Sequence, residues 1–140
     1  MECIRGNSYS AVSLIKKLGI KEGFALYIKN SPINYSQLLG RMPKDATVKP
    51  RLAKGLDFVH CFVNTQKELA EFLPKAKAAI SANGMIWISW PKKASKVNTD
   101  LSEDVIRRIC LPLDLVDVKV CAIDNMWSGL KLVIRKEKRN

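Results

Sequence analysis

Three short, continuous runs of apolar residues divide the chain, at positions 24–28, 56–63 and 85–90. Their length is that of strands, and a strand without polar alternation is covered on both faces. We therefore predict that these runs are central strands of a mostly parallel sheet that lies between helices. The Asn83-Gly84 pair before the third run predicts a turn that separates this strand from the helix before it.

Apolar residues at helical spacing predict helices between these strands. The first covers residues 11–18, with Ser10 as a possible N-cap and Gly19 as its C-terminal stop. Ser31-Pro32 follows the first strand directly, and a capping residue before a proline predicts the start of a short second helix.

Two longer helices are predicted in the second half of the chain. Either Asn64 or Thr65 can cap the third helix, which ends shortly before the strand at 85–90. Pro74 falls inside this helix, so we expect a kink or a break there. Asp100 and Glu103 have the spacing of a capping box, which predicts the start of the fourth helix.

The pattern changes at the end of the chain. Apolar and polar residues alternate over 116–122 and again over 130–134, which predicts an antiparallel pair exposed on one side. Residues 47–50 form a weak, proline-ended strand that we place at a sheet edge. With residues 1–10 as an arm and 136–140 as a charged tail, the order of elements predicts a single α/β domain.

Composition agrees with one globular domain and excludes a membrane protein. The chain has 140 residues, 47% of them hydrophobic, and charged residues interrupt every run that could span a bilayer. The N-terminus has no apolar segment of a secretory signal, which predicts a cytoplasmic location. The four cysteines show neither close pairing nor metal-type spacing, so we expect reduced thiols.

The charge is strongly basic, with 24 Lys and Arg against 13 Asp and Glu and a net charge of +11. Such an excess favours polyanions, and it also keeps a small domain soluble. Basic stretches at 49–54, 92–96 and 135–139 make weak, salt-dependent nucleic-acid binding one hypothesis.

Three segments resemble the class I S-adenosylmethionine (SAM)-dependent methyltransferase fold: "GLDFVHCFV", "LPKAKAAISANGMIWIS" and "LDLVDVKVCAIDNMWSGLKLVIRK". The resemblance implies a three-layer, Rossmann-like domain with six strands in the order 2-1-3-4-6-5, of which only the last is antiparallel. It also implies a glycine-rich cofactor loop after the first strand and an acid after the second. Here the first position reads Asn30-Ser31-Pro32 without glycine, and the second reads Lys49-Pro50-Arg51. We therefore predict no cofactor.

The chain also resembles, over nearly its whole length, a small bacterial domain family of uncharacterised function. The segments that carry this likeness are "SLIKKLGIKEG", "DFVHCFV", "ISWPKK" with "TDLSEDVIR", and "VDVKVCAIDNMWSGLKLV". The resemblance implies no activity.

The predicted sheet brings several loops to one edge, because the carboxyl ends of parallel strands meet there and the terminal hairpin turn returns to it. Two tryptophans with nearby cations suit a base, a nucleotide or another planar or phosphorylated anion, and mutual packing of the two rings is the alternative. The candidate ligand-binding residues are Asn30, Ser31, Asn64, Trp90, Lys92, Lys93, Asp124, Trp127 and Ser128.

No residue set in the sequence points to catalysis or to a metal. His60, the one histidine, lies within a strand, where we expect a buried, hydrogen-bonded side chain. Cys61 and Cys121 are expected in the core, with no further histidine to activate them. Our leading hypothesis is thus a non-catalytic ligand- or partner-binding domain. The alternative is a SAM-dependent methyltransferase whose cofactor lies at the helix start of Ser31-Pro32.

Overall fold

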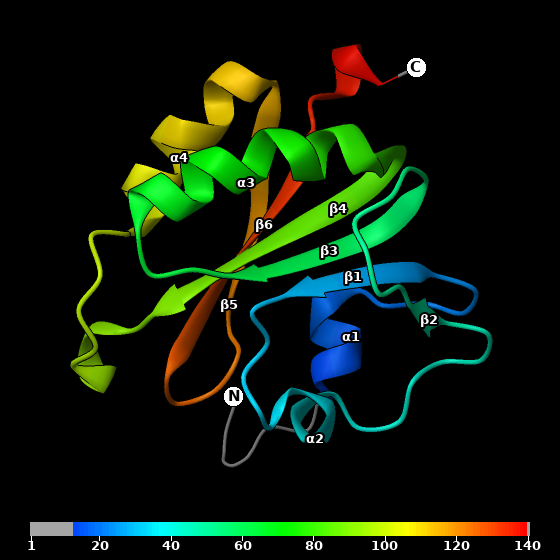
Figure 1. Ribbon diagram of the computed structural model, residues 1–140, viewed down its shortest axis with the longest axis horizontal. Coiled ribbons are helices and arrows are strands. Elements are labelled where there is room, and N and C mark those ends of the chain that lie inside the picture. The colour runs from blue at the N-terminus through cyan, green and yellow to red at the C-terminus, as the bar shows by residue number, and fades with distance from the viewer. Residues whose placement is uncertain (1–12, 140) are drawn as a thin grey trace.

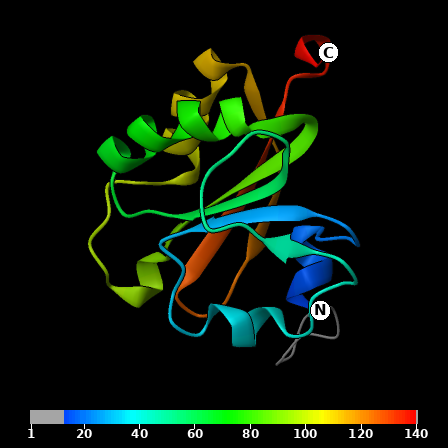
Figure 2. The same cartoon turned by 45° about the vertical axis from the view of Figure 1, so that its right-hand side comes forward.

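The chain folds into three layers around one sheet (Figure 1). The computed structural model describes residues 13–139, so the predicted arm, Ser10, Cys3 and the last residue of the tail lie outside them. Figures 1 and 2 show α1 and α2 below the sheet and α3 and α4 above it, as the three-layer prediction requires. The helices are α1 (Leu14–Leu18), α2 (Tyr35–Leu39), α3 (Gln66–Ala79) and α4 (Glu103–Cys110), with 3₁₀ turns η1 (Lys93–Ser95), η2 (Leu111–Leu113) and η3 (Lys136–Lys138).

The sheet has six strands in the order β2-β1-β3-β4-β6-β5, which confirms the predicted topology. β1 pairs in parallel with β2 and β3, and β3 pairs in parallel with β4. β6 inserts between β4 and β5 and runs antiparallel to both. The strands are β1 (Ala25–Lys29), β2 (Thr47–Val48), β3 (Leu56–Phe62), β4 (Ile80–Pro91), β5 (Leu115–Ala122) and β6 (Trp127–Ile134).

Alternate residues of each strand enter two separate cores, because successive side chains point to opposite faces of a sheet. On β3, Val59 and Cys61 pack in the core under α3 and α4. Phe58 and Phe62 pack in the core over α1 and α2. All of these side chains are buried, which confirms that the 56–63 run is a central strand.

The two short helices begin later than the sequence predicts. Ser13 caps α1 by accepting the Lys16 N–H, so the predicted cap at Ser10 is wrong, whereas Gly19 ends the helix in the left-handed region at φ 83° as expected. α2 begins after Asn34, three residues beyond the predicted start. The reason is local: the Pro32 carbonyl accepts the Tyr35 N–H at 3.0 Å, so a turn precedes the helix.

The two longer helices also differ from prediction at one point each. Thr65, one of the two predicted caps, caps α3, and the helix continues past Pro74, so of the kink or break that was expected there the break is wrong. Pro74 lies on the exposed side, where water can bond the carbonyl that the proline leaves without a donor. Ser102, not Asp100, caps α4. The Asp100 carboxylate instead accepts the Gln66 N–H at 2.8 Å, and so binds the start of α3.

β4 is longer than predicted because it follows α3 directly. The predicted turn at Asn83-Gly84 is wrong, since both residues lie within the strand at an irregularity of the ladder with β3. The register of the ladder shifts there, because Leu56 pairs with Ile80 whereas Phe58 pairs with Met85. A Cβ at position 84 would lie 2.9 Å from the Ile80 Cβ, so this close approach needs glycine.

Within residues 13–139, no helix has the length and apolar content that a membrane crossing requires.

Candidate functional site

A shallow cavity opens at the carboxyl ends of β1 and β3. After β1 the chain continues to α2 below the sheet, and after the neighbouring strand β3 it continues to α3 above the sheet (Figure 1). This is the topological switch point, where open α/β sheets bind ligands. The cavity has a volume of about 330 Å³. We call it the switch-point cavity; its lining residues are Asn30, Phe62, Asn64, Glu68 and Trp127.

Asn30 directly follows β1 and lines the switch-point cavity. Its φ is 57°, in the left-handed region that asparagine tolerates better than most residues other than glycine. Its side-chain amide donates a hydrogen bond to the Phe62 carbonyl at 3.2 Å. This bond connects the loop after β1 to the end of β3 and fixes the width of the cavity at that point.

Asn64 and Glu68 come from the turn that starts α3. Thr65 Oγ1 accepts the Glu68 N–H at 3.1 Å, and the Glu68 carboxylate lies near both the Thr65 hydroxyl and the Asn64 N–H. This is a capping-box arrangement, and the T-x-x-E spacing in the sequence is the signal that could have placed Glu68 here. The side chain of Asn64 is exposed at the cavity.

Trp127 reaches the switch-point cavity from the first residue of β6. Its ring meets Phe62 edge to face, with 5.0 Å between the ring centroids. The turn before it is held by Asp124, whose carboxylate accepts the N–H groups of Met126 and Trp127, both at 2.9 Å. The hairpin turn thus returns to the strand-end edge as predicted, and the Lys92 N–H donates to the Met126 carbonyl at 2.8 Å.

Three of the predicted residues therefore line one cavity, and the others do not. Asp124 and Lys92 hold the hairpin turn beside it, and Lys93 is exposed in η1. Ser31 lines a different cavity, next to α2. Phe62 and Glu68 were not predicted, because the last residue of an apolar strand and the acid of a helix cap look purely structural in a sequence.

The two tryptophans do not converge, contrary to both alternatives that the sequence left open. Trp90 is buried in the core under α3 and α4, whereas Trp127 packs on the core over α1 and α2. Ladder pairing explains this: Trp90 lies opposite Ser128, and Trp127 lies opposite Pro91, so the two rings fall on opposite faces. Trp90 and Ser128 accordingly belong to the other face of the sheet.

A buried chain of hydrogen bonds supports the switch-point loop from below. His60 is fully buried, with Nδ1 2.8 Å from the Tyr35 hydroxyl and Nε2 2.8 Å from the Ser89 hydroxyl. Burial lowers the pKa of His60 from 6.5 to about 3, so the imidazole is neutral and one nitrogen donates while the other accepts. The expectation of a buried, hydrogen-bonded histidine is confirmed.

This chain connects β4, β3 and α2, because its three members come from one element each. Burial also raises the pKa of the Tyr35 hydroxyl, which therefore stays protonated. The hydrogen-bonded set of Tyr35, His60 and Ser89 anchors α2 to the sheet, and through α2 it positions the loop that carries Asn30.

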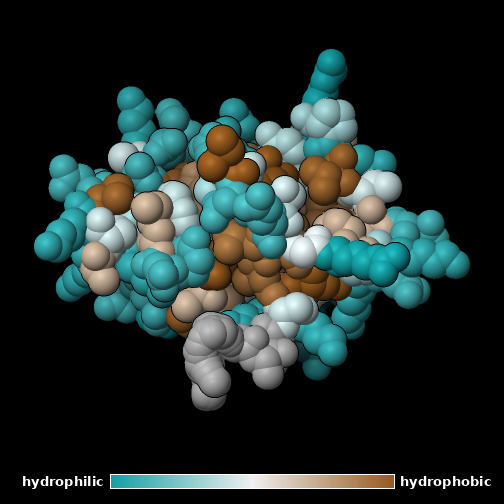
Figure 3. Space-filling model, turned by 90° about the horizontal axis from the view of Figure 1, so that it is seen from below, coloured by the Kyte–Doolittle hydropathy of each residue, from teal (hydrophilic) through white to brown (hydrophobic). Residues whose placement is uncertain are grey.

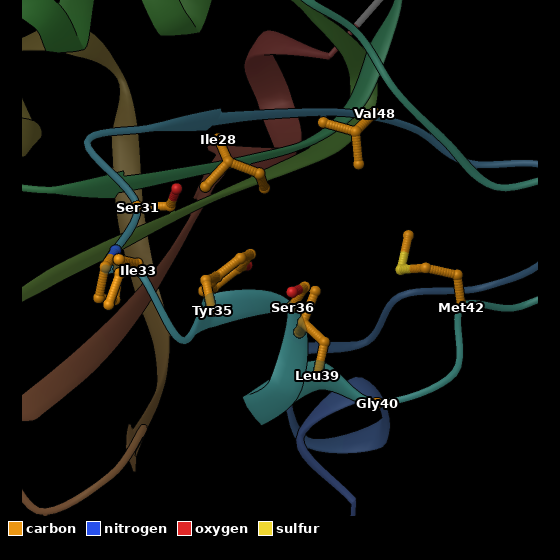
Figure 4. A pocket seen from close by; sticks show the side chains of 10 residues that line it. Ile28, Ser31, Ile33, Tyr35, Ser36, Leu39, Gly40, Met42 and Val48 are labelled. Carbon is orange, nitrogen blue, oxygen red and sulfur yellow. The ribbon is translucent and has the colours of Figure 1, made fainter.

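A second, more apolar cavity of about 380 Å³ lies between α2 and the β1–β2 edge (Figure 4). Figure 4 shows Ile28 and Val48 on the sheet side, facing Tyr35, Leu39 and Met42 across the cavity. Figure 3 shows apolar side chains gathered near the middle of this side of the molecule. Three of the residues that line this cavity carry a hydroxyl group: Ser31, Tyr35 and Ser36.

Within residues 13–139, neither a cluster of metal ligands nor a cysteine with a lowered pKa is found. No group of three or more His, Cys, Asp or Glu side chains could hold a metal ion there. Cys61, Cys110 and Cys121 are free thiols. Burial raises the pKa of Cys61 to about 12 and of Cys110 to about 11, and it also raises that of Cys121.

Comparison with known proteins identifies the fold. No family model matches the sequence, and no curated protein matches it significantly. Similar solved structures include a SAM-dependent methyltransferase from Aquifex aeolicus, with a TM-score of 0.59, 16% identity, and coverage of 86% of this chain and 88% of that chain. The fold is that of the methyltransferases.

Two further similar structures contain SAM or S-adenosylhomocysteine (SAH). Magnesium protoporphyrin IX methyltransferase from Synechocystis PCC 6803 with bound SAM has a TM-score of 0.56 at 10% identity, covering 86% of this chain and 74% of that chain. The DhpI-SAH complex has a TM-score of 0.60 at 8% identity, covering 89% of this chain and 83% of that chain. At these identities the likeness establishes the scaffold and nothing about activity.

Proposed function

We propose that this chain is a non-catalytic domain that binds a small planar ligand with polar edges, such as a nucleobase or nucleotide, in the switch-point cavity. The observation that carries the proposal is the convergence of Asn30, Asn64 and Trp127, from the ends of three strands, on one cavity at the fold's ligand-binding edge. Amide side chains both donate and accept hydrogen bonds, as the edge of a heterocycle requires, and the indole ring offers a surface for stacking.

The reactive side chains support binding rather than catalysis. His60 makes both of its ring hydrogen bonds to Tyr35 and Ser89, so neither nitrogen is available as a base. Glu68, the carboxylate of the cavity, contacts the cap of α3. These groups hold the scaffold in place, whereas the Asn64 side chain, the indole ring of Trp127 and the part of the Asn30 amide that does not bond to Phe62 face the cavity.

SAM is the second candidate ligand, because structures of the same fold contain SAM or SAH. Two features weigh against it. The backbone after β1 is crowded by the Asn30 side chain bonded to Phe62, where a close approach of the cofactor would need glycine. The residues after β2 are exposed cations, Lys49 and Arg51, which cannot accept hydrogen bonds from ribose hydroxyls. The residues present do not fit this cofactor.

Calorimetric titration with a panel of nucleobases, nucleosides, nucleotides and SAM tests the proposal. We expect at least one planar compound to bind, and Asn64→Ala to weaken it at least tenfold, about 1.4 kcal/mol. Asn64 is exposed, so this substitution leaves the fold intact; Asn98→Ala, in the exposed loop after β4, is the matched control. Absence of binding across the panel, or equal affinity of both variants, contradicts the proposal. Micromolar binding of SAM alone would replace it with the second candidate.

A further inference from the structure

Four lysines from three elements lie close together on the α1 side of the β5–β6 edge. Lys119 on β5 and Lys131 on β6 are direct partners in the antiparallel ladder. The Lys119 ammonium donates to the Lys17 carbonyl at 3.0 Å, at the C-terminal end of α1. Lys21 follows α1 and lies close enough to Lys131 to lower its pKa. We call Lys17, Lys21, Lys119 and Lys131 the lysine cluster.

The lysine cluster is electrostatically unfavourable in the free protein. Like charges directly opposite each other on paired strands destabilise a sheet. Lys131 is partly buried, and burial, with Lys119 and Lys21 adding to it, lowers the pKa of this lysine. Lys119 and Lys17, together with Lys92, also impose a positive field on Cys121.

Acidic side chains do not neutralise the lysine cluster within residues 13–139. The ion pairs formed there use Lys77, Arg107 and Arg135, and Asp117 of β5 pairs with Arg107 on the other face of the sheet. One interaction does favour the cluster: the Lys119 ammonium meets the partly negative end of α1. A single helix end, however, offsets at most a fraction of one charge, so among residues 13–139 most of the positive charge of the cluster stays uncompensated.

We propose that the lysine cluster binds the phosphodiester backbone of a nucleic acid. The cations lie on a surface formed by the end of α1, the edge strand β5 and its neighbour β6, and Lys119 and Lys21 are exposed. Closely spaced point charges on a surface match the regular phosphates of a polyanion, and lysine contacts phosphates without reading bases. The net charge of +11 attracts such a partner from a distance. This surface is separate from the switch-point cavity and does not depend on its ligand.

Fluorescence anisotropy with a labelled 20-base-pair DNA duplex, between 50 and 200 mM NaCl, tests the proposal. The test variant is Lys119→Gln with Lys131→Gln, and the control is Lys54→Gln with Lys138→Gln, which removes the same charge from exposed positions on other elements. Each lost phosphate contact reduces the slope of log Kd against log salt by about 1. Over this fourfold range of salt, the wild type should therefore lose about tenfold more affinity than the test variant.

The control variant should keep the slope of the wild type. Melting temperatures of both variants show whether they fold; in the test variant, relief of the Lys119–Lys131 repulsion should offset the loss of the hydrogen bond from Lys119 to the Lys17 carbonyl. Three results would overturn the proposal: no binding of the duplex by the wild type at 50 mM salt, equal slopes for both double variants, or binding of vesicles with 30% phosphatidylserine in place of the duplex. The last result would assign the cluster to a lipid surface.

Discussion

The two faces of the sheet are covered in different ways. α3 and α4 are 14 and 8 residues long, and the core beneath them consists mainly of aliphatic side chains. α1 and α2 have five residues each, and the core above them contains the rings of Phe58, Phe62, Tyr35 and Trp87. Both cavities described above lie partly or wholly on the side of the short helices.

The short helices are attached to the sheet by polar side chains as well as by packing. Trp87 Nε1 donates to the Leu18 carbonyl at 2.9 Å, Lys119 Nζ donates to the Lys17 carbonyl, and His60 contacts the Tyr35 hydroxyl. On the other face, a comparable ionic link joins Arg107 to Asp117 at the β5 edge. A five-residue helix buries little apolar surface, so directed hydrogen bonds supply the orientation that a longer helix obtains from its apolar stripe.

Removal of the largest anchor should destabilise the molecule most. Trp87 is fully buried, so Trp87→Ala should lower the free energy of unfolding by about 3–5 kcal/mol, measured by urea denaturation. Trp87→Phe keeps most of the ring volume and removes the bond to Leu18, at a cost of about 1–2 kcal/mol. If Trp87→Phe were as stable as the wild type, the hydrogen bond would not anchor α1.

The histidine anchor should make stability depend on pH. The folded-state pKa of His60 is lowered from 6.5 to about 3, so between these values the unfolded chain binds a proton that the folded chain does not. The free energy of unfolding should therefore fall as the pH falls below 6.5, by about 2 kcal/mol between pH 6.5 and 4.5. His60→Gln should lose this part of the slope and keep the part due to carboxylates. Parallel curves for both proteins would show that His60 does not carry the effect.

A pair of matched tyrosine substitutions compares the two faces directly. Tyr35→Phe leaves the buried His60 Nδ1 without its partner and should cost about 1–2 kcal/mol. Tyr27 lies on the α3 side, where its ring stacks near Phe72, so Tyr27→Phe should change stability by less than about 0.5 kcal/mol. Equal costs for the two substitutions would mean that the polar anchor adds nothing to packing on the α2 side.

The sequence predicts the sheet better than the helices and the site. The buried strands follow from the three apolar runs, whereas the strand order was implied by the resemblance to the methyltransferase fold. The same runs do not indicate which face of the sheet each side chain occupies, because a strand without polar alternation has apolar residues on both faces. For this reason the opposite orientations of Trp90 and Trp127 could not be predicted, since they depend on the pairing of β4 with β6.

Helix starts were missed where a tertiary contact decides between adjacent polar residues. Asp100 and Ser102 both precede α4. Ser102 is the N-cap of this helix, because the Asp100 carboxylate instead accepts the N–H of Gln66, 34 residues away in α3. The switch-point cavity was predicted in part, through the strand ends that carry Asn30, Asn64 and Trp127. Glu68 could also have been included from its T-x-x-E spacing.

The insertion of the last strand has a consequence for the synthesis of the protein. β6 lies between β4 and β5, so a nascent chain that ends before residue 127 leaves the long edge of β4 without a partner. An exposed apolar edge of this kind is a site for aggregation until it is paired. Trp127 arrives on the same strand, so the wall of the switch-point cavity is completed only when the sheet itself closes. A chain truncated after β5 should thus lose solubility and the proposed ligand site in a single step.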